Sequence, residues 1–567
     1  MDLEKTQSPV IDSASDEYDY SDEHEHEHDH DHDHDHEHEH PDPIELSRIK
    51  SYQLQQKATV GSTRAPEPRE QWLPMGAGKE YPPLLPAPER YVVEFDGADD
   101  PMHPHNWSML RRSILAAILC YATFAASFTS AVFSAAISSV SKEFHVGTEV
   151  STLGVTLYVF GFAAGPTIWA PASELIGRRW PLSIGLLGCG IFTIACATGK
   201  DFQTIMLGRF FGGLFAASPV SLVPAVFADL FNTAQRGIVM CTFCMAVFVG
   251  PFASPFVGGF IAMSPLGWRW TMYVPSLMVF LGFILVFCFL DETYPPVILV
   301  RKAAILRRQT RNWGIHAKQD EVEVDIKELV RNNFTRPLTM LATEPILLLI
   351  SLYISFIYGL IYALLGAYPV VFEDVYGMSM GVGGLAFIGL ILGELLGGVF
   401  VLCLQGSYKR KLDANGGKPV PEWRLPAATV GAVAFAIGMF WFGWTGYTNK
   451  IHWMAPTASG VLTGLGIFCI FLQCFNYIVD CYPTLAASTI AANTILRSLV
   501  GCVFPLFSRQ MMINMGVQWA GTLLGCIAAV MIPIPIGFMM YGPWLRKKSK
   551  LAASPVYEVG EERKGDV

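Results

Sequence analysis

Twelve long apolar segments limit what this chain can fold into. A helix that crosses a bilayer needs roughly 20 mostly apolar residues, because its length must match the hydrocarbon layer. Backbone polar groups in lipid must be satisfied within the segment, so such runs are expected to be helical. The fold predicted is therefore an all-α membrane protein with twelve transmembrane helices. The runs lie at 113–138, 149–170, 180–198, 203–226, 238–261, 272–290, 345–368, 382–405, 426–447, 454–476, 484–507 and 518–541.

Charge is concentrated outside these segments. Charged residues make up only 16% of the chain, whose net charge is −9, yet residues 1–45 alone carry a net charge of −17. An acidic head on an apolar, mildly basic body argues against one soluble globular domain. The basic residues form no continuous stripe, which argues against a nucleic-acid-binding protein. Residues 1–110 are expected to be a disordered cytoplasmic tail, because such a composition cannot build a core.

Histidine alternates with aspartate or glutamate from residue 24 to residue 40 of this tail. Imidazole and carboxylate groups suit zinc, copper and nickel, so His24, His26, His28 and His30 are weak metal-binding candidates. The favoured alternative is low-complexity drift in a solvated segment, since the repeat implies no fixed coordination geometry. No other metal site and no cofactor is expected.

Lysine and arginine set the predicted orientation. One set of loops carries basic clusters such as Arg178-Arg179 and residues 409–411, whereas the loops on the other side carry one basic residue or none. The positive-inside rule then places both termini in the cytoplasm.

The longest loop between spans divides the chain into two halves. Two six-helix halves are the expected build of one large class of secondary transporters, and no Walker A sequence is present to bind ATP. The expected divisions are a six-helix half at 111–290, a cytoplasmic central loop at 291–344, a second half at 345–545 and a cytoplasmic tail at 546–567.

Four ionisable residues fall within or at the edge of these spans, and each is a functional candidate because charge in lipid is costly. They are Arg209, Glu394, Asp480 and Arg497. A carboxyl group in an apolar cavity favours its protonated form, which is what proton coupling requires. Glu394 and Asp480 are therefore the candidate proton carriers. The alternative for Asp480 is a charge partner for Arg497 or for the adjoining loop.

Polar side chains also follow single faces of several spans. Such stripes either line a central cavity or form hydrogen bonds between helices. Thr123, Ser127, Ser130 and Ser134 form one in the first span, for which helix–helix hydrogen bonding is favoured. The candidate cavity residues are Tyr358 and Tyr362, Gln473 and Asn476 (on one face with Asp480), and Asn493 and Arg497 (on one face with Thr489).

Motifs near these residues resemble a known family. Residues 170–179, Ala-Pro-Ala-Ser-Glu-Leu-Ile-Gly-Arg-Arg, lie between the second and third spans, and residues 250–259 combine glycine and proline pairs in the fifth. Together with Arg209, they resemble the major facilitator superfamily, in its fungal twelve-span drug:proton antiporter group of multidrug and polyamine exporters. The resemblance covers roughly residues 91–550.

The resemblance implies roles for individual residues. Arg209 is implicated in proton coupling. A charge relay that latches the inner gate is implied for Glu174, Gly177, Arg178 and Arg179, with Asp229 and Arg236 as the charged pair after the fourth span. The antiporter signature that separates exporters from symporters is matched by Gly250, Pro251, Gly258 and Gly259.

The implied function is proton-coupled export of amphipathic small molecules, such as drugs, antifungals, toxins or secondary metabolites, by alternating access. Fifty-seven phenylalanine and tyrosine residues suit a broad apolar cavity. One alternative is a polyamine:proton exporter, which would need two or more cavity acids where only Glu394 lies deep. Another is a transporter-like nutrient or metal sensor that uses the histidine repeat. An enzyme is not expected, because the sequence shows no nucleophile–base pair.

The expected partners are a small-molecule substrate, protons and the lipid bilayer. One chain supplies both halves of a cavity, so a functional monomer is expected. The expected location is the plasma membrane, with the vacuolar membrane as the alternative.

Overall fold

The computed structural model describes residues 91–551, apart from 98, 311, 322–325, 417–419, 483–484 and 550. The side chains at 233–234, 326–334 and 486–487 are not described either. His24, His26, His28 and His30 lie outside the described residues.

Twelve helices within the described residues are long and apolar enough to cross a membrane, which confirms the twelve predicted spans. The first six are α2 (Met109–Val132) continued by η4 (Phe133–Ala136) and α3 (Ile137–Phe144), α4 (Thr148–Ile176), α5 (Arg179–Thr198), α6 (Phe202–Leu230), α7 (Thr233–Met263) and α8 (Trp270–Phe289). The other six are α11 (Pro345–Pro369) with the π-helical η6 (Val370–Val375), α12 (Met380–Gly384) with η7 (Leu385–Phe387) and α13 (Ile388–Ala414), η8 (Pro421–Arg424) with α14 (Leu425–Gly446), α15 (Met454–Cys481), α16 (Ala486–Met515), and α17 (Val517–Met531) with α18 (Pro533–Lys548).

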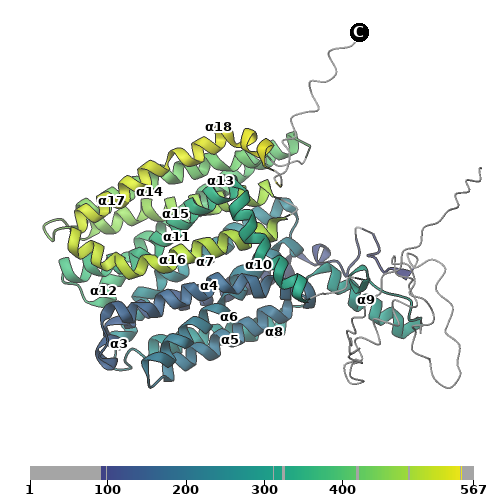
Figure 1. The fold of residues 1–567 in the computed structure, drawn as a ribbon, viewed down its shortest axis with the longest axis horizontal. Helices are drawn as coiled ribbons and strands as arrows, with labels where there is room; N and C mark the ends of the chain where they lie inside the picture. Colours follow the sequence, from purple (N-terminus) through teal and green to yellow (C-terminus); the bar gives the residue numbers. More distant parts are fainter. Residues whose placement is uncertain are drawn as a thin grey trace, which may run out of the picture. The chain divides into compact units, whose positions relative to one another are not determined.

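These helices run side by side as a bundle (Figure 1). Helices α4, α5, α6 and α8, in blue, occupy one side of the bundle, and α13 to α18, in green to yellow, occupy the other. Between the first six spans and the last six, α4 packs on α16, and α7 packs on α12 and α13. The bundle therefore consists of two groups of helices with an interface between them. The first group is α2 to α8, and the second is α11 to α18.

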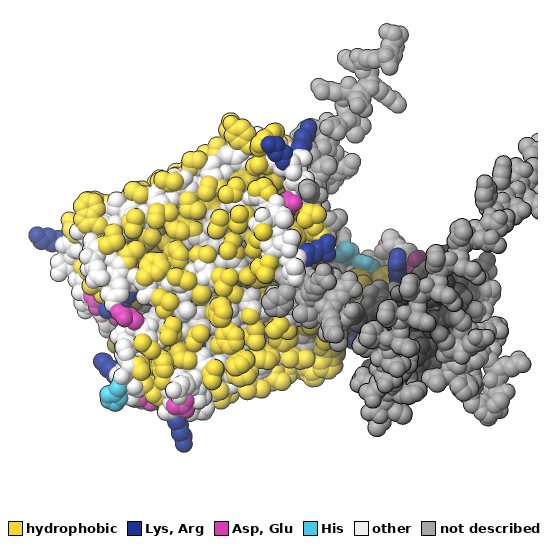
Figure 2. Space-filling model, viewed as in Figure 1, with side chains coloured by type: hydrophobic (Ala, Val, Ile, Leu, Met, Phe, Trp, Pro, Cys, Tyr) yellow, Lys and Arg dark blue, Asp and Glu magenta, His cyan; other side chains and the backbone are white. Residues whose placement is uncertain are grey.

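The side of the bundle is apolar and its charges lie at the ends. Figure 2 shows hydrophobic side chains covering the helices, with lysine, arginine, aspartate and glutamate gathered at the two ends of the bundle. The exposed apolar side chains include Leu207, Leu277, Val399 and Val530. Apolar surface of this extent fits contact with lipid rather than with water.

The chain between the two sets of spans forms α9 (Pro295–Thr310), η5 (Lys318–Glu321) and α10 (Ile326–Thr343). The segment before α2 packs against α9 and its following loop. The amide of Val93 donates to the carbonyl of His316 over 2.8 Å, and the Lys302 ammonium lies 3.2 Å from the Asp100 carboxylate. Defined contacts therefore begin before residue 111, the expected start of the first half.

Asp100 organises this segment, and its removal should loosen it. Its carboxylate accepts from the amides of Asp96 and Met102 over 2.9 and 2.8 Å, and these amides hold the pKa of Asp100 below its ordinary value. The stabilisation is therefore complete above about pH 4 and lost only as pH falls through the lower folded pKa. We expect Asp100→Ala to speed hydrogen exchange at the Val93 amide about tenfold.

The control is Asp96→Ala, because the Asp96 side chain is 87% exposed although it also lies near Lys302. We expect almost no change in exchange for this variant. Equal exchange rates in the two variants would show that Asp100 does not hold the segment.

Candidate functional site

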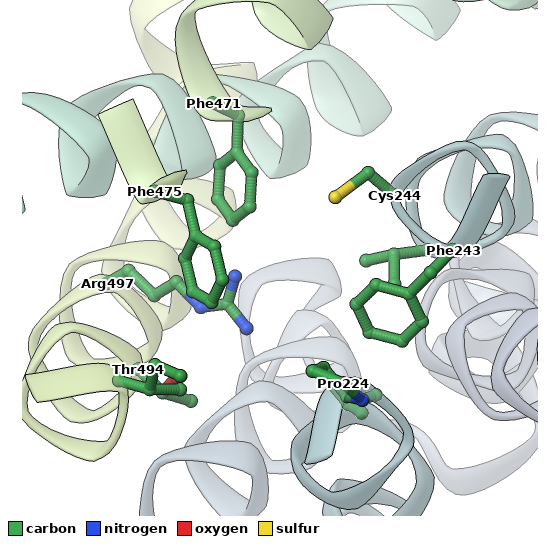
Figure 3. A pocket seen from close by; sticks show the side chains of 10 residues that line it. Pro224, Phe243, Cys244, Phe471, Phe475, Thr494 and Arg497 are labelled. Carbon is green, nitrogen blue, oxygen red and sulfur yellow. The ribbon is translucent and has the colours of Figure 1, made fainter. Parts of the chain in front are cut away.

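A narrow pocket lies at the interface between the two groups of helices. It is bordered by the later parts of α6 and α15 and the earlier parts of α7 and α16, which meet toward the end of the bundle where α9 and α10 lie. Its walls are largely apolar and aromatic (Figure 3). The lining residues are Val220 and Pro224; Phe243, Cys244 and Val247; Phe471 and Phe475; and Ile490, Thr494 and Arg497.

Of the expected cavity residues, Arg497 lines this pocket. On α16 the pocket is lined by Ile490, Thr494 and Arg497. The expected face of this helix combined Arg497 with Thr489 and Asn493, and these two residues do not line the pocket. On α15 the pocket is lined by phenylalanines, at positions 471 and 475, and Gln473 and Asn476 are not among the lining residues. Each residue turns the helix by about 100°, so an error of one or two positions changes a polar wall into an aromatic one.

The Arg497 guanidinium is buried between two rings. The side chain is 6% exposed, and its guanidinium carbon lies 5.0 Å from the centre of the Tyr358 ring and 5.1 Å from that of Phe471. Its Nε has no hydrogen-bond partner. In Figure 3 its terminal nitrogens point into the pocket. Tyr358, expected to line the cavity, thus contributes by supporting the arginine.

Arg209 on α6 is buried in a different way. Its Nε donates to the carbonyl of Gly154 over 2.8 Å, and its two terminal nitrogens donate to those of Thr129 and Ser130 over 2.8 and 2.7 Å. The Thr129 carbonyl can accept from Arg209 because α2 changes to a 3₁₀ turn at Phe133. The amide of Phe133 donates to the carbonyl of Ala131 rather than to that of Thr129. A break in the first span therefore creates the acceptors that hold this arginine.

A line of hydroxyl groups connects the surroundings of the two arginines. The Ser130 hydroxyl lies 3.0 Å from that of Tyr362, which lies 3.5 Å from that of Tyr358, the ring beneath Arg497. Ser130 belongs to the first group of helices and the tyrosines to α11 in the second. The Ser/Thr stripe of the first span thus forms a contact between helices at Ser130, whereas Thr123 bonds its own helix at the Leu119 carbonyl.

Glu394 on α13 is fully buried, and neither of its carboxylate oxygens has a hydrogen-bond partner. Glycines around it bring α13 and α15 together. A Cβ atom on Gly393 would lie 2.1 Å from the carbonyl oxygen of Val461, and one on Gly464 would lie 2.1 Å from that of Leu390. Glu394 is not among the residues that line the pocket. It is therefore a buried acid at a tight helix contact near the interface.

Asp480 lies at the end of α15 and pairs with Arg424, whose Nε is 2.5 Å from its carboxylate. The partner of Asp480 is therefore Arg424, in the segment just before α14, rather than Arg497. Asp480 does not line the pocket. An ion pair of the same kind joins Arg178 and Asp229 over 3.2 Å in the first group of helices. In both pairs the arginine stands at the start of a span and the aspartate at the end of the next one.

The loop between α4 and α5 is organised by Glu292, which was not among the predicted site residues. This buried carboxylate accepts from the amides of Arg178 and Arg179 over 2.8 and 3.4 Å, at the positive end of α5. Glu174 is exposed, and its backbone carbonyl accepts from Gln319 over 3.0 Å. The acidic side chain that contacts the amides of Arg178 and Arg179 is therefore Glu292 and not Glu174.

Arg236, the expected partner of Asp229, instead donates to the carbonyl of Ala228 over 3.3 Å. The Asp229 carboxylate is taken by Arg178, whose Nη1 also donates to the Ser173 hydroxyl over 2.6 Å. Arg236 thus caps the end of α6 and does not form an ion pair with Asp229.

Gly177 leaves room for Glu292. Its backbone, with φ 91° and ψ 172°, occupies a region open essentially to glycine alone, and an added Cβ would lie 2.1 Å from the Glu292 carboxylate. We expect Gly177→Ala to cost about 3 kcal/mol or more, from backbone strain together with displacement of the buried carboxylate. Thermal unfolding of the purified variant measures this.

Gly267 provides the control, because it also has a positive φ (77°) but no atom within 4 Å of an added Cβ. Gly267→Ala should cost about 1 kcal/mol from backbone strain alone. Equal losses in the two variants would mean that contact with Glu292 contributes nothing.

The glycines of α7 face two different neighbours. A Cβ atom on Gly250 would meet Ser127 and Phe128 of α2, and one on Gly258 would meet Val132 and Ala135. One on Gly259 would instead lie 2.9 Å from the carbonyl of Met380, on α12 of the other group. Pro251 lies within the helix between these contacts. This face of α7 therefore packs closely on the first span and, at its far end, across the interface.

Comparisons with known proteins agree with this architecture. The sequence profile described as Major Facilitator Superfamily matches residues 119–505. The chain is 45% identical over 518 residues to the "Major facilitator superfamily multidrug transporter FLU1" of Candida albicans, covering 90% of this chain and 85% of that protein. It is 46% identical over 482 residues to the "Multidrug transporter TPO1_2" of Candida glabrata, covering 85% and 83%.

Solved structures share the fold at much lower identity. The proton:xylose symporter XylE bound to 6-bromo-6-deoxy-D-glucose matches with a TM-score of 0.54 and 17% identity, over 76% of this chain and 97% of that chain. A partially occluded inward open conformation of XylE from E. coli matches with a TM-score of 0.52 and 17% identity, over 75% and 97%. This likeness shows the fold alone.

Proposed function

The chain belongs to the Major Facilitator Superfamily, and from that premise we propose that it is a proton-coupled secondary transporter. It exports amphipathic small molecules by alternating access, with the two groups of helices rocking about the pocket between them. The observation that carries this proposal is the pocket itself, which lies at their interface and has aromatic walls. Apolar walls with few fixed polar groups accept many amphipathic compounds, in keeping with relatives named as multidrug transporters.

Proton coupling is assigned to Glu394. It is a fully buried carboxyl group without a hydrogen-bond partner, so its ionised form is stable only after a rearrangement that admits water or a cation. A proton bound in one conformation and released in the other then gives the two conformations different free energies, which is what coupling requires. Arg209 keeps the first span in its broken form beside the interface.

The arrangement in the membrane follows from the basic loops. The end of the bundle with α9 and α10 faces the cytoplasm, together with both termini. The plasma membrane is the proposed location, with the vacuolar membrane as the alternative. The pocket is formed by one chain, so the monomer is the proposed functional unit. The family consists of transporters, and no enzymatic reaction is proposed.

The pocket does not favour the polyamine alternative. A polycation needs carboxylates around it, and the ten residues lining the pocket include one arginine and no aspartate or glutamate. The sensor alternative rests on the histidine repeat, outside the described residues. Deleting residues 1–60 separates the two functions, since export should survive the deletion and signalling should not.

The test is efflux of fluorescent amphipathic compounds from cells that express the chain, at two external pH values and with or without a protonophore. A panel of cationic, neutral and anionic compounds avoids dependence on one substrate. We expect efflux of at least one compound to rise at acid pH and to collapse with the protonophore. Efflux that ignores the protonophore would remove the proton-coupling proposal, and absence of efflux across the panel would remove the export proposal.

A further inference from the structure

One charged group in the pocket has no counter-charge. Arg497 is 6% exposed, and no carboxylate among the described residues forms an ion pair with it. The titratable groups that face it are Tyr358, Tyr362 and Cys244, and none of them is a carboxylate. A guanidinium keeps its charge at any physiological pH. The pocket therefore holds one uncompensated positive charge.

Comparison with Arg209 shows that this charge is available to a ligand. Three of the Arg209 nitrogens donate to backbone carbonyls, at 2.7 to 2.8 Å. The partners of Arg497 are the faces of two rings, its Nε is unpaired, and its terminal nitrogens point into the pocket. Ring contacts on the flat side of a guanidinium leave its edge donors free. Arg209 thus has its acceptors within the protein, whereas Arg497 presents donors to the pocket.

The walls around this arginine suit an apolar molecule. Phe243, Phe471 and Phe475 line the pocket, and the Thr494 side chain lies one helical turn before Arg497. A flat or extended hydrocarbon body can pack against these rings while one anionic end reaches the arginine. A carboxylate is the matching group, because its two oxygens pair with two parallel donors of the guanidinium.

We infer that this pocket selects amphipathic organic anions, with the substrate's carboxylate bound by Arg497 and its apolar body against the phenylalanines. The inference rests on the proposed export function and narrows its substrate class. A cation of the same size is disfavoured, since binding it would leave two positive charges together in a site with few compensating groups.

The test is equilibrium binding to the full-length protein in lipid nanodiscs, with empty nanodiscs as the blank. The probes are 4-(1-pyrenyl)butanoate, the corresponding alcohol and the corresponding primary amine, which share one ring system and differ in charge at neutral pH. We expect the carboxylate to bind about tenfold or more tightly than the amine, with the alcohol between them. This comparison needs no variant and so does not depend on a mutant folding.

Arg497→Gln should bring the three dissociation constants within about twofold to threefold, whereas Arg497→Lys should retain part of the preference. The matched control is Arg509→Gln, the same change on α16 at an arginine that is outside the pocket and paired with Asp374. It should leave the preference unchanged. The inference is overturned if the wild-type protein binds the amine or the alcohol as tightly as the carboxylate, or if Arg497→Gln keeps the preference. Efflux of other compounds in the cell panel would then still support export.

Discussion

Replacing Arg209 with alanine is expected to destabilise the bundle and to eliminate proton-coupled export, although the chain still inserts in the membrane. The variant leaves the carbonyls of Gly154, Thr129 and Ser130 without their donors in a buried site. Each unsatisfied buried polar group costs about 1–3 kcal/mol, so a loss of about 3 kcal/mol or more is expected. The measurements are thermal unfolding in nanodiscs and pH-driven transport in proteoliposomes.

The broken form of the first span is the reason for the size of this effect. Without Arg209, the Thr129 and Ser130 carbonyls gain most by returning to regular α-helical bonding, which straightens the chain at Phe133. The Ser130 hydroxyl, 3.0 Å from Tyr362, would then move relative to the second group of helices. Transport should therefore fall even at temperatures where the variant remains folded.

Arg209→Lys and Arg509→Ala complete this experiment. Lysine has a single nitrogen and cannot reach three carbonyls in a guanidinium's geometry, so it should give an intermediate stability. Arg509 is partly exposed at a bundle end, and its removal should change stability by less than about 1 kcal/mol. An Arg209→Ala variant as stable as Arg509→Ala would refute the structural role.

Hydropathy was sufficient to predict the twelve spans, because a membrane imposes one length and one polarity on every helix that crosses it. The burial of Arg209 and Glu394 could be predicted because ionisable residues are rare within membrane spans and almost always face the interior of the bundle. Both residues are indeed buried. Neither inference depends on knowing which helices are neighbours.

The partners of these residues depend on contacts between distant segments. Glu292 follows the sixth span, and only the folded chain brings it to the amides at the start of α5. The break at Phe133 has no proline or glycine to mark it. The pocket faces of α15 and α16 differ from the expected ones because a polar stripe can equally well face a neighbouring helix. The pair Phe471 and Phe475, four residues apart, was an available signal for the aromatic wall.

Replacing Glu394 with glutamine is expected to abolish proton-driven transport while leaving folding nearly unchanged. Glutamine has the shape of a protonated glutamate but cannot release a proton. Because both carboxylate oxygens are buried without partners, the described conformation suits the neutral form, and the amide should change stability by only about 1 kcal/mol. Gradient-driven transport should fall about 100-fold or more, because each coupled cycle requires this proton.

Two proteoliposome assays separate coupling from binding. Transport driven by a pH gradient requires Glu394 to take up and release a proton in each cycle. Exchange of labelled for unlabelled substrate without a gradient requires only that the loaded pocket alternate between the two sides. We expect Glu394→Gln to lose the first activity and to keep the second, since a permanently neutral side chain still permits one loaded conformation to convert into the other.

Glu94→Gln is the matched control, because it makes the same chemical change at an exposed position before the first span. It should keep both activities. If Glu394→Gln retains gradient-driven transport at the wild-type rate, the proton is carried elsewhere, and Glu394 is a packing residue of the contact between α13 and α15. If it loses exchange as well, the buried carboxyl is needed for the conformational change itself. Only the loss of gradient-driven transport with exchange intact assigns the proton to this side chain.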